Sequence, residues 1–357
     1  MNQVSQFRLT GVALPANAER MLDEICEHFV EHADVSRTAE LALLTSKLGT
    51  ASIRLTDEKL LIELDCPSER ALQLARTSIA EHMFYFAGDE PLDLTWAGPA
   101  APAAVPNLHE VKVVAVADVT PHMRRVTFSC TNVTPFIGGD MHVRVLIPPK
   151  GRPPVWPGYR ADGRLAWPKG NDELAVRVYT IRAVDAERRE LTIDFFQHTV
   201  PGEKTPGGDF ARDAQPGDVA ALIGPGSGDL PKAHSILMIG DESALPAIAR
   251  IAAEVPAGTT IKAIIEVLDA AEEQPLPSAG NVDVRWLYRR NYAAGATGVI
   301  AEEARKAIDA VDAETFVWAA CEKQDARAIR SVLKSREHDK NLKYVAWYWE
   351  RSRAQAG

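Results

Sequence analysis

The sequence lacks a long hydrophobic run: its 357 residues nowhere offer the roughly 20 consecutive apolar residues that a membrane-spanning helix needs. The first ten residues also lack the basic segment followed by an apolar segment that marks a secretory signal. Excess positive charge is absent too, because the formal net charge is −9, which argues against a general nucleic-acid-binding protein. We therefore expect a cytoplasmic protein with no membrane span and no nucleic-acid partner.

Cysteine is scarce and scattered. The four cysteines are Cys26, Cys66, Cys130 and Cys321, and none forms a Cys-x-x-Cys pair. This spacing argues against a zinc site or an iron–sulfur cluster held by cysteine. Histidine, aspartate and glutamate form no compact ligand set either, so the sequence assigns no metal ligand and no catalytic side chain.

Residues 1–97 show the pattern of a small α+β domain. Two amphipathic helical patterns flank two strand patterns. The helices are expected at 16–32 and 69–86, and the strands at 51–55 and 60–64. A Pro/Ala-rich stretch at 97–106 has little capacity to form a core, so it is expected to be a linker between domains.

Residues 107–232 carry short strand patterns without long helices between them, which indicates an antiparallel barrel or sandwich. The strands are expected at 111–116, 125–129, 143–147, 176–182, 191–196 and 219–223. One insertion, at 148–172, is rich in proline, glycine, tryptophan and arginine and is expected to form an extended loop.

Residues 233–350 alternate between strand and helix patterns, which predicts a parallel, doubly wound sheet. The strands are expected at 236–239, 260–268, 282–288, 315–320 and 343–347, and the helices at 244–254, 298–309 and 325–336. The chain is therefore predicted to be multidomain. A barrel followed by such a sheet suits a prosthetic group in one half and a dinucleotide in the other.

The predicted strand at 176–182 carries Arg177, Tyr179 and Thr180. Arg177 and Tyr179 point to the same face of a strand, where a guanidinium can pair with phosphate and a phenol can pack on an aromatic cofactor. The next strand ends near His198 and leads to Gly207 and Gly208, whose backbone N–H groups could approach a phosphate at a helix N-terminus. The simpler interpretation is an edge strand with solvated side chains and a loop that merely turns.

Asp241, Glu242, Ser243 and Ala244 follow the first strand of the parallel half, where a dinucleotide usually binds. The Gly-x-Gly-x-x-Gly fingerprint is absent. The two carboxylates would repel a pyrophosphate, so they either cap the next helix or face the site of hydride transfer. A simple cap is at least as well supported by the spacing.

The order of these strings resembles the siderophore-interacting protein family of FAD-binding ferric-chelate reductases. The strings are Arg177-Val178-Tyr179-Thr180, the glycines at 207 and 208, a closing turn at Gly224-Pro225, and Gly240-Asp241-Glu242-Ser243-Ala244-Leu245-Pro246, with Val284-Arg285-Trp286-Leu287, Val317-Trp318-Ala319-Ala320 and Tyr348-Trp349 further on. The resemblance covers about residues 107–350. Residues 1–97 resemble a small domain family of unknown role that is sometimes fused to these reductases.

The resemblance implies a ferredoxin-reductase-like fold. It places FAD at Arg177, Tyr179 and Thr180, with His198, Gly207 and Gly208 near the pyrophosphate. It also places Asp241, Glu242, Ser243 and Ala244 on the NAD(P)H side. The chain departs from the family in having Phe210-Ala211 after its glycine pair, and Ala320-Cys321-Glu322 where the family has Ala-Gly-Glu.

The resemblance implies that hydride passes from NAD(P)H to FAD and that single electrons then reduce ferric iron in a siderophore or another ferric chelate. Reduction releases the metal, because oxygen-rich chelators hold ferric iron better than ferrous iron. Two alternatives stay open. One is a flavin-dependent reductase of a protein such as ferredoxin, and the other is a non-catalytic siderophore-binding protein.

Two sets of arginines complete the predicted site. Arg289 and Arg290 follow the strand at 282–288, and a guanidinium fork suits the 2′-phosphate of NADPH, so NADPH is favoured over NADH. No acidic residue is expected at this edge to hold a free ribose hydroxyl. The simpler interpretation is that both are solvated. A basic surface for an anionic chelate is expected from Arg124, Arg160, Arg164 and Arg182.

Overall fold

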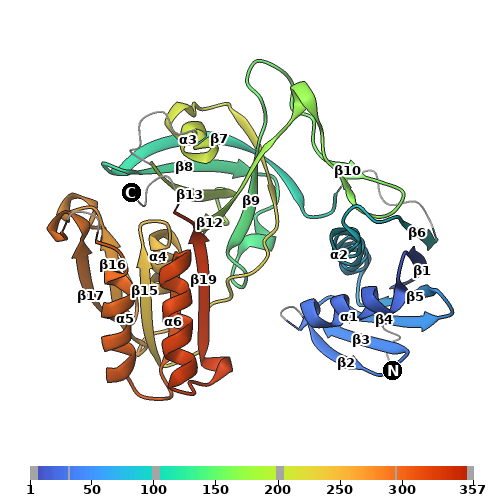
Figure 1. The fold of residues 1–357 in the computed structure, drawn as a ribbon. Coiled ribbons are helices and arrows are strands. Elements are labelled where there is room, and N and C mark those ends of the chain that lie inside the picture. The colour runs from blue at the N-terminus through green and yellow to red at the C-terminus, as the bar shows by residue number, and fades with distance from the viewer. Residues whose placement is uncertain (1–6, 31–32, 99–104, 198–204, 294–295, 352–357) are drawn as a thin grey trace, which may run out of the picture. The chain divides into compact units, whose positions relative to one another are not determined.

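The computed structural model describes residues 7–30, 33–98, 105–197, 205–293 and 296–351. These residues form two compact units (Figure 1). The N-terminal unit comprises residues 1–108 together with 151–174, and the C-terminal unit comprises 109–150 and 175–357. The segment 151–174, which lies inside the range predicted for the barrel, thus packs with the N-terminal unit instead.

The N-terminal unit contains a six-stranded antiparallel sheet. In order across the sheet, its strands are β2 (Asp34–Arg37), β3 (Leu41–Ser46), β4 (Gly49–Thr56), β5 (Lys59–Cys66), β1 (Phe7–Pro15) and β6 (Leu92–Ala97). The two predicted strands are confirmed as β4 and β5. Four further strands were not predicted.

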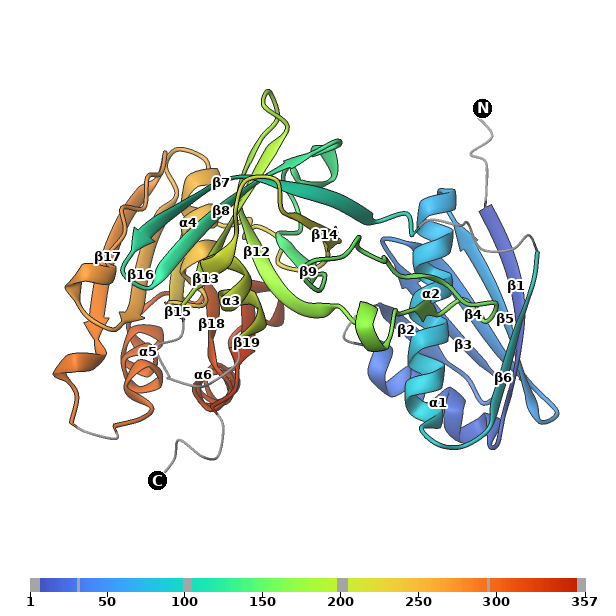
Figure 2. The same cartoon turned by 90° about the horizontal axis from the view of Figure 1, so that it is seen from above.

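Two helices cover one face of this sheet (Figure 2). They are α1 (Ala18–Phe29) and α2 (Glu69–Ala87), at the positions that the periodicity predicts. Asn17 and Ser68 cap their N-termini through their side-chain oxygens, which satisfies backbone N–H groups that the helix leaves free. Leu60, Ile62 and Leu64 alternate along β5 and are all buried against the helices.

The C-terminal unit begins with a closed six-stranded barrel, ordered β12-β13-β8-β7-β14-β9. All six predicted strands are present. Their bounds are β7 (Leu108–Thr120), β8 (Met123–Cys130), β9 (His142–Ile147), β12 (Ala175–Asp185), β13 (Glu190–Phe196) and β14 (Val219–Ile223). A short helix, α3 (Pro206–Asp213), closes over the buried aromatic side chains of Phe128 and Phe195.

A five-stranded parallel sheet follows, ordered β17-β16-β15-β18-β19. The strands are β15 (Ser235–Asp241), β16 (Thr260–Val267), β17 (Asn281–Tyr288), β18 (Phe316–Glu322) and β19 (Lys343–Trp349), and the helices are α4 (Leu245–Glu254), α5 (Val299–Ala310) and α6 (Lys323–Ser335). Met238 on β15 packs with α4, whereas its neighbours Leu237 and Ile239 pack with α5 and α6. The helices therefore cover both faces, and the predicted doubly wound sheet is confirmed.

Buried polar side chains join the barrel to the sheet. Arg250 on α4 is 1% exposed and donates from its guanidinium to the carbonyl oxygens of Ile181 and Phe136, each at 2.9 Å. The carboxylate of Glu272, just after β16, accepts from the Thr120 hydroxyl at 2.5 Å and from the His122 ring. Such contacts hold the two halves as one body. Within the described ranges, no helix combines the length and apolar character needed to cross a bilayer.

Candidate functional site

Strand β12 and helix α3 bring together two parts of the predicted flavin site. A β-carbon added to Gly207 would lie 1.8 Å from the Tyr179 hydroxyl oxygen, so the glycine backbone rests directly against that side chain. The Tyr179 ring also packs on Phe195, with 4.3 Å between ring centroids. Burial raises the pKa of the Tyr179 phenol to about 12, which keeps it neutral.

The first turn of α3 lies beside this tyrosine. Gly207 and Gly208 are buried there, and the N-cap residue Thr205 makes no capping hydrogen bond with its side chain. Uncapped N–H groups at a helix N-terminus suit a phosphate. Arg177 is exposed on β12, where its guanidinium donates to the Val176 carbonyl at 2.8 Å. His198 lies outside the described residues.

Thr180 begins a hydrogen-bonded chain that the sequence did not reveal. Its hydroxyl lies 3.2 Å from Nδ1 of His142 on β9, and Nε2 of the same ring lies 2.9 Å from the Tyr348 hydroxyl on β19. Burial, assisted by the charge of Arg250, lowers the pKa of His142 to about 4. The neutral imidazole of His142 therefore connects β12, which carries part of the candidate flavin site, to β19, the last strand of the sheet.

The carboxyl ends of β15 and β18 lie at the topological switch point of the sheet, the position where a dinucleotide usually binds, because α4 and α6 leave these strands toward opposite faces. Asp241 at the end of β15 accepts from the Ser243 amide at 2.9 Å and from the Trp349 indole at 2.7 Å. Its carboxylate therefore orders the turn into α4. Ala244 is fully buried at the start of that helix.

The paired arginines correct one expectation. Carboxylates are present at this edge: Arg289 forms ion pairs with Glu242 and with Glu266, the latter at 3.4 Å, and Arg290 forms one with Asp269 at 2.5 Å. The sequence pattern missed them because they lie at or just after the carboxyl ends of β15 and β16, which the sheet order brings near the end of β17. Burial raises the pKa values of Glu242 and Glu266, so Arg289 is needed to hold their charge.

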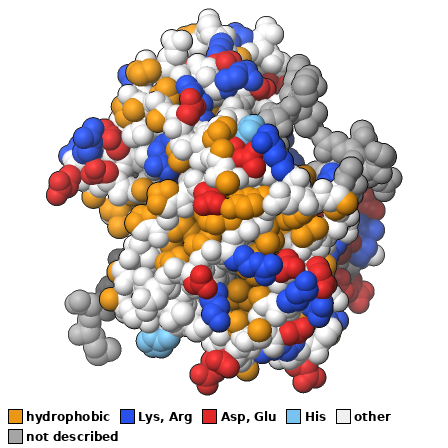
Figure 3. All heavy atoms as spheres, turned by 90° about the vertical axis from the view of Figure 1, so that its left-hand side faces the viewer, with side chains coloured by type: hydrophobic (Ala, Val, Ile, Leu, Met, Phe, Trp, Pro, Cys, Tyr) orange, Lys and Arg blue, Asp and Glu red, His pale blue; other side chains and the backbone are white. Residues whose placement is uncertain are grey.

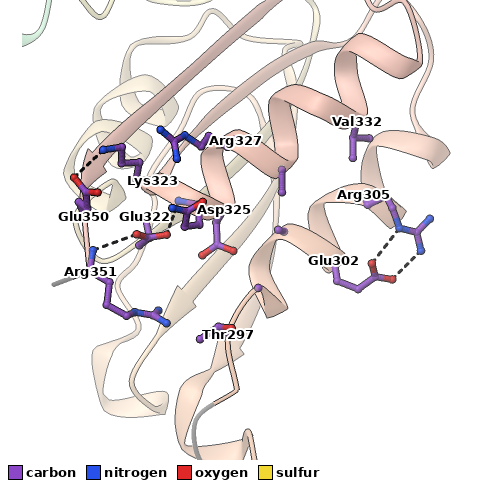
Figure 4. Close-up of a pocket in the computed structure, with 14 residues that line it drawn as sticks. Thr297, Glu302, Arg305, Glu322, Lys323, Asp325, Arg327, Val332, Glu350 and Arg351 are labelled. Atoms are coloured by element: carbon purple, nitrogen blue, oxygen red, sulfur yellow. Dashed lines mark hydrogen bonds and ion pairs between the residues drawn. The ribbon is translucent and has the colours of Figure 1, made fainter. Parts of the chain in front are cut away.

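A cavity of about 820 Å³ opens where the N-termini of α5 and α6 meet (Figure 4). Glu322 caps α6, Lys323 pairs with Glu350, and Arg351 donates its amide to Glu322. Asp325 faces the space beside these groups, and burial, together with the charge of Glu322, raises its pKa to about 6. Charged side chains of both signs line the cavity together with Ala301, Ala328 and Val332.

Comparison with known proteins shows which family shares these domains. Residues 112–229 match the siderophore-interacting FAD-binding domain, and residues 233–352 match the siderophore-interacting protein domain. The chain is 30% identical over 241 residues to the ferric vibriobactin reductase of Vibrio cholerae, covering 66% of this chain and 86% of that protein. The chain belongs to the siderophore-interacting protein family. Residues 11–97 match a domain described only as an uncharacterized protein conserved in bacteria.

Solved structures of this family share the fold. A siderophore utilization protein from T. fusca aligns with a TM-score of 0.55 at 30% identity, over 70% of this chain and 96% of that one. Ferredoxin-NADP⁺ reductase from Plasmodium falciparum aligns with a TM-score of 0.50 at 13% identity, over 70% of this chain and all of that one. The barrel and sheet are thus ferredoxin-reductase-like, as the sequence predicted.

The four arginines predicted to attract an anionic chelate are divided between the units. Arg160 and Arg164 belong to the N-terminal unit, whereas Arg124 and Arg182 belong to the C-terminal unit. Arg124 is already bonded to the Ala211 carbonyl at 2.7 Å and to Asp118 at 2.6 Å. On the face drawn in Figure 3, acidic and basic side chains are interspersed around a band of hydrophobic ones.

Sequence reasoning missed two residues that organise the site, His142 and Arg250. Arg250 carried a usable signal, because it stands alone among the apolar residues of α4 and a buried arginine needs acceptors. His142 carried none, because a histidine at the start of a strand has no distinctive spacing. Its partners are 38 and 206 positions away in the chain.

Proposed function

We propose that this member of the family is an FAD-dependent NAD(P)H:ferric-siderophore reductase. The observation that carries the proposal is the contact between Tyr179 and Gly207, which joins the aromatic side chain of β12 to an uncapped helix N-terminus. An aromatic surface beside phosphate-binding N–H groups suits a phosphorylated isoalloxazine cofactor. Family membership and the named activity of the Vibrio cholerae relative support the same conclusion.

The residues present fit FAD. Arg177 is exposed and can turn its guanidinium to a phosphate, Tyr179 offers its ring, and the lack of a β-carbon at Gly207 lets the first turn of α3 lie against that tyrosine. A hydrogen bond to His142 holds the Thr180 side chain in place. When bound, FAD would supply the conversion of a two-electron hydride donor into one-electron reduction of ferric iron.

For the nicotinamide cofactor we propose NADPH, recognised through Arg290. Its side chain is 66% exposed and pairs, among the described residues, with Asp269, whereas Arg289 is fixed between the buried carboxylates of Glu242 and Glu266. A 2′-phosphate would compete with Asp269 for the Arg290 guanidinium. We therefore expect a modest preference for NADPH, and a structural role for Arg289.

The ferric chelate is proposed to be reduced without direct ligation by the protein. Among the described residues, no group of three or more histidine, cysteine, aspartate or glutamate side chains is placed to hold a metal ion. Iron would therefore arrive and react in its chelator. Of the four predicted arginines, Arg182 on β12 is the cation that we propose for contact with an anionic chelate.

The proposal is tested with purified protein reconstituted with FAD. NADPH oxidation is followed with a panel of ferric siderophores and a ferrous-specific chromophore, and separately with ferredoxin. Activity with ferric siderophores but not with ferredoxin supports the proposal. Activity with ferredoxin alone would favour the protein-acceptor alternative, and a protein that binds ferric siderophores but neither FAD nor NADPH would be a binding protein.

A further inference from the structure

The insertion between β9 and β12 carries a small hairpin that is seated on the N-terminal unit. The hairpin comprises β10 (Gly158–Tyr159), β11 (Leu165–Ala166) and the turn between them, and it lies along α2 (Figures 1 and 2). Four backbone groups of the hairpin are bonded by side chains of α2 and β6. The bonds run from Arg76 Nη2 to the Ala161 carbonyl (3.1 Å), from Thr77 Oγ1 to the Gly163 carbonyl (3.2 Å), from Trp96 Nε1 to the Asp162 carbonyl (2.8 Å) and from the Leu165 amide to Glu81 Oε1 (2.9 Å).

The turn fits this seat through a glycine. Gly163 has a φ of +92°, and a β-carbon there would lie 3.0 Å from Arg76 Nε and 3.1 Å from Trp96 Nε1. Arg76 itself is only 3% exposed and lies over the Trp96 ring at 5.6 Å from its centroid. Burial lowers the pKa of this guanidinium, so the hairpin carbonyl that it bonds compensates a buried charge.

A side chain of the hairpin completes the contact. The guanidinium of Arg164 lies 3.3 Å from the centroid of the Phe84 ring on α2. Asp162 holds that guanidinium with bonds of 2.7 Å and 3.0 Å, which fixes it over the ring. Arg160, by contrast, is exposed at the same turn and bonds through its backbone.

The arms that carry the hairpin are themselves tied together. Arg152 on the outgoing arm donates to the Asn171 carbonyl at 2.6 Å and pairs with Asp172 at 3.1 Å on the returning arm. The returning arm then enters β12 at Ala175, two positions before Arg177. A restraint on the hairpin is therefore a restraint on the chain that leads into the candidate flavin strand.

We propose that the N-terminal domain, residues 11–97, is a receptor for the β-hairpin at 158–166 of the same chain. The domain recognises mainly the backbone groups of the hairpin. Gly163 allows the close approach to Arg76 and Trp96, and Arg164 packs on Phe84. Because the returning arm continues directly into β12, we expect docking to restrain the chain just before Arg177 and so to support retention of FAD by the barrel. The receptor role is independent of the proposed reductase function, whereas the effect on FAD rests on it.

The receptor role is tested in the full chain by inserting a specific protease site between Ala101 and Pro102. After cleavage, the N-terminal fragment should co-elute with the rest of the chain in native size-exclusion chromatography. Gly163→Val, which leaves every receptor side chain unchanged, should make the fragments separate, and Arg160→Ala is the matched control that should not. Separation of the fragments in the otherwise unmodified chain, or co-elution with Gly163→Val, would overturn the receptor role.

The effect on the flavin is measured in uncut protein. Gly163→Val should weaken FAD binding several-fold in fluorescence titration, relative to Arg160→Ala. Equal FAD affinities in the two variants would overturn the link to β12 while leaving the elution result intact. Loss of FAD binding in all forms, including the unmodified chain, would contradict the proposed function instead.

Discussion

The Tyr348 hydroxyl lies 2.9 Å from Nε2 of His142. This contact links β19, the last strand of the sheet, to β9, the barrel strand that pairs with β12. The other ring nitrogen lies 3.2 Å from the Thr180 hydroxyl. A neutral imidazole can donate at one nitrogen and accept at the other, so this ring satisfies both hydroxyl groups. A protonated ring could only donate, which would change both bonds.

His142→Leu should lower the free energy of unfolding at pH 7 by about 1–3 kcal/mol, because the hydroxyls of Thr180 and Tyr348 each lose one hydrogen-bond partner. The effect should shrink at acid pH. Burial depresses the pKa of His142 to about 4, so the unfolded state binds a proton more readily and the unmodified protein loses stability as pH falls from about 6.5 toward 4. That loss is about 2 kcal/mol between pH 7 and pH 5. Urea unfolding at both pH values tests this, and an identical variant effect at both would contradict it.

Gly207→Ala should abolish stable FAD binding, because the added carbon collides with the Tyr179 hydroxyl and forces either the ring or α3 to move. Gly226→Ala is the control, since a β-carbon there meets nothing within 4 Å. The measurement is bound FAD per protein after desalting, with circular dichroism to confirm folding. Full FAD content in folded Gly207→Ala would show that this contact does not form part of the flavin site.

Asp269→Ala should raise the preference for NADPH over NADH, because it frees the Arg290 guanidinium for the 2′-phosphate. Arg290→Ala should reduce kcat/KM for NADPH about tenfold or more, which corresponds to about 1.4 kcal/mol, and should leave NADH almost unchanged. Arg289→Ala should instead lower stability, because it leaves two buried carboxylates without their cation. If Asp269→Ala, Arg290→Ala and Arg289→Ala all keep the cofactor preference of the unmodified protein, this edge does not recognise the 2′-phosphate.

Asp325→Asn should stabilise the protein at neutral pH. Burial and Glu322 raise the pKa of Asp325 to about 6, so the folded state holds its proton more tightly and loses stability as pH rises from about 4 through 6. Allowing for solvent screening at the cavity, the gain at pH 7 should be about 1–2 kcal/mol. It should vanish near pH 4. An equal gain at both pH values, measured by urea unfolding, would mean that charge is not the cause.

The barrel and the parallel sheet could be predicted because their strands and helices have recognisable local sequence patterns. Each of their strands is a short apolar run bounded by turns, and helices alternate with strands only in the second half. In the N-terminal unit, β1 escaped prediction because Gly11 and Pro15 disfavour a strand and the apolar Leu14 stands on its exposed face. The Trp96 ring packs where a side chain on Gly11 would lie, so that glycine is explained only by the fold.

The neighbourhood of Tyr179 and Gly207 in the candidate site was predictable, whereas contacts that only the topology creates were not. Tyr179 and Gly207 could be proposed as neighbours because the same cofactor would need both. The pairing of Arg289 with Glu242 could not, because the two residues are 47 positions apart on strands whose order the sequence leaves open. The contact between the hairpin and α2 could not be predicted either. Arg76 and Trp96 bond to backbone carbonyls, and a backbone carbonyl leaves no mark in the side-chain pattern.

The most direct test of the central claim is the anaerobic stoichiometry of iron reduction by the FAD-reconstituted protein. A limiting amount of NADPH is added to excess ferric siderophore, and ferrous iron is counted with a chromophoric trap. Hydride carries two electrons and ferric iron accepts one, so we predict two ferrous ions per NADPH, with none formed when FAD is omitted. Ferrous iron formed equally well without FAD, or NADPH consumed with no ferrous iron released, would contradict it.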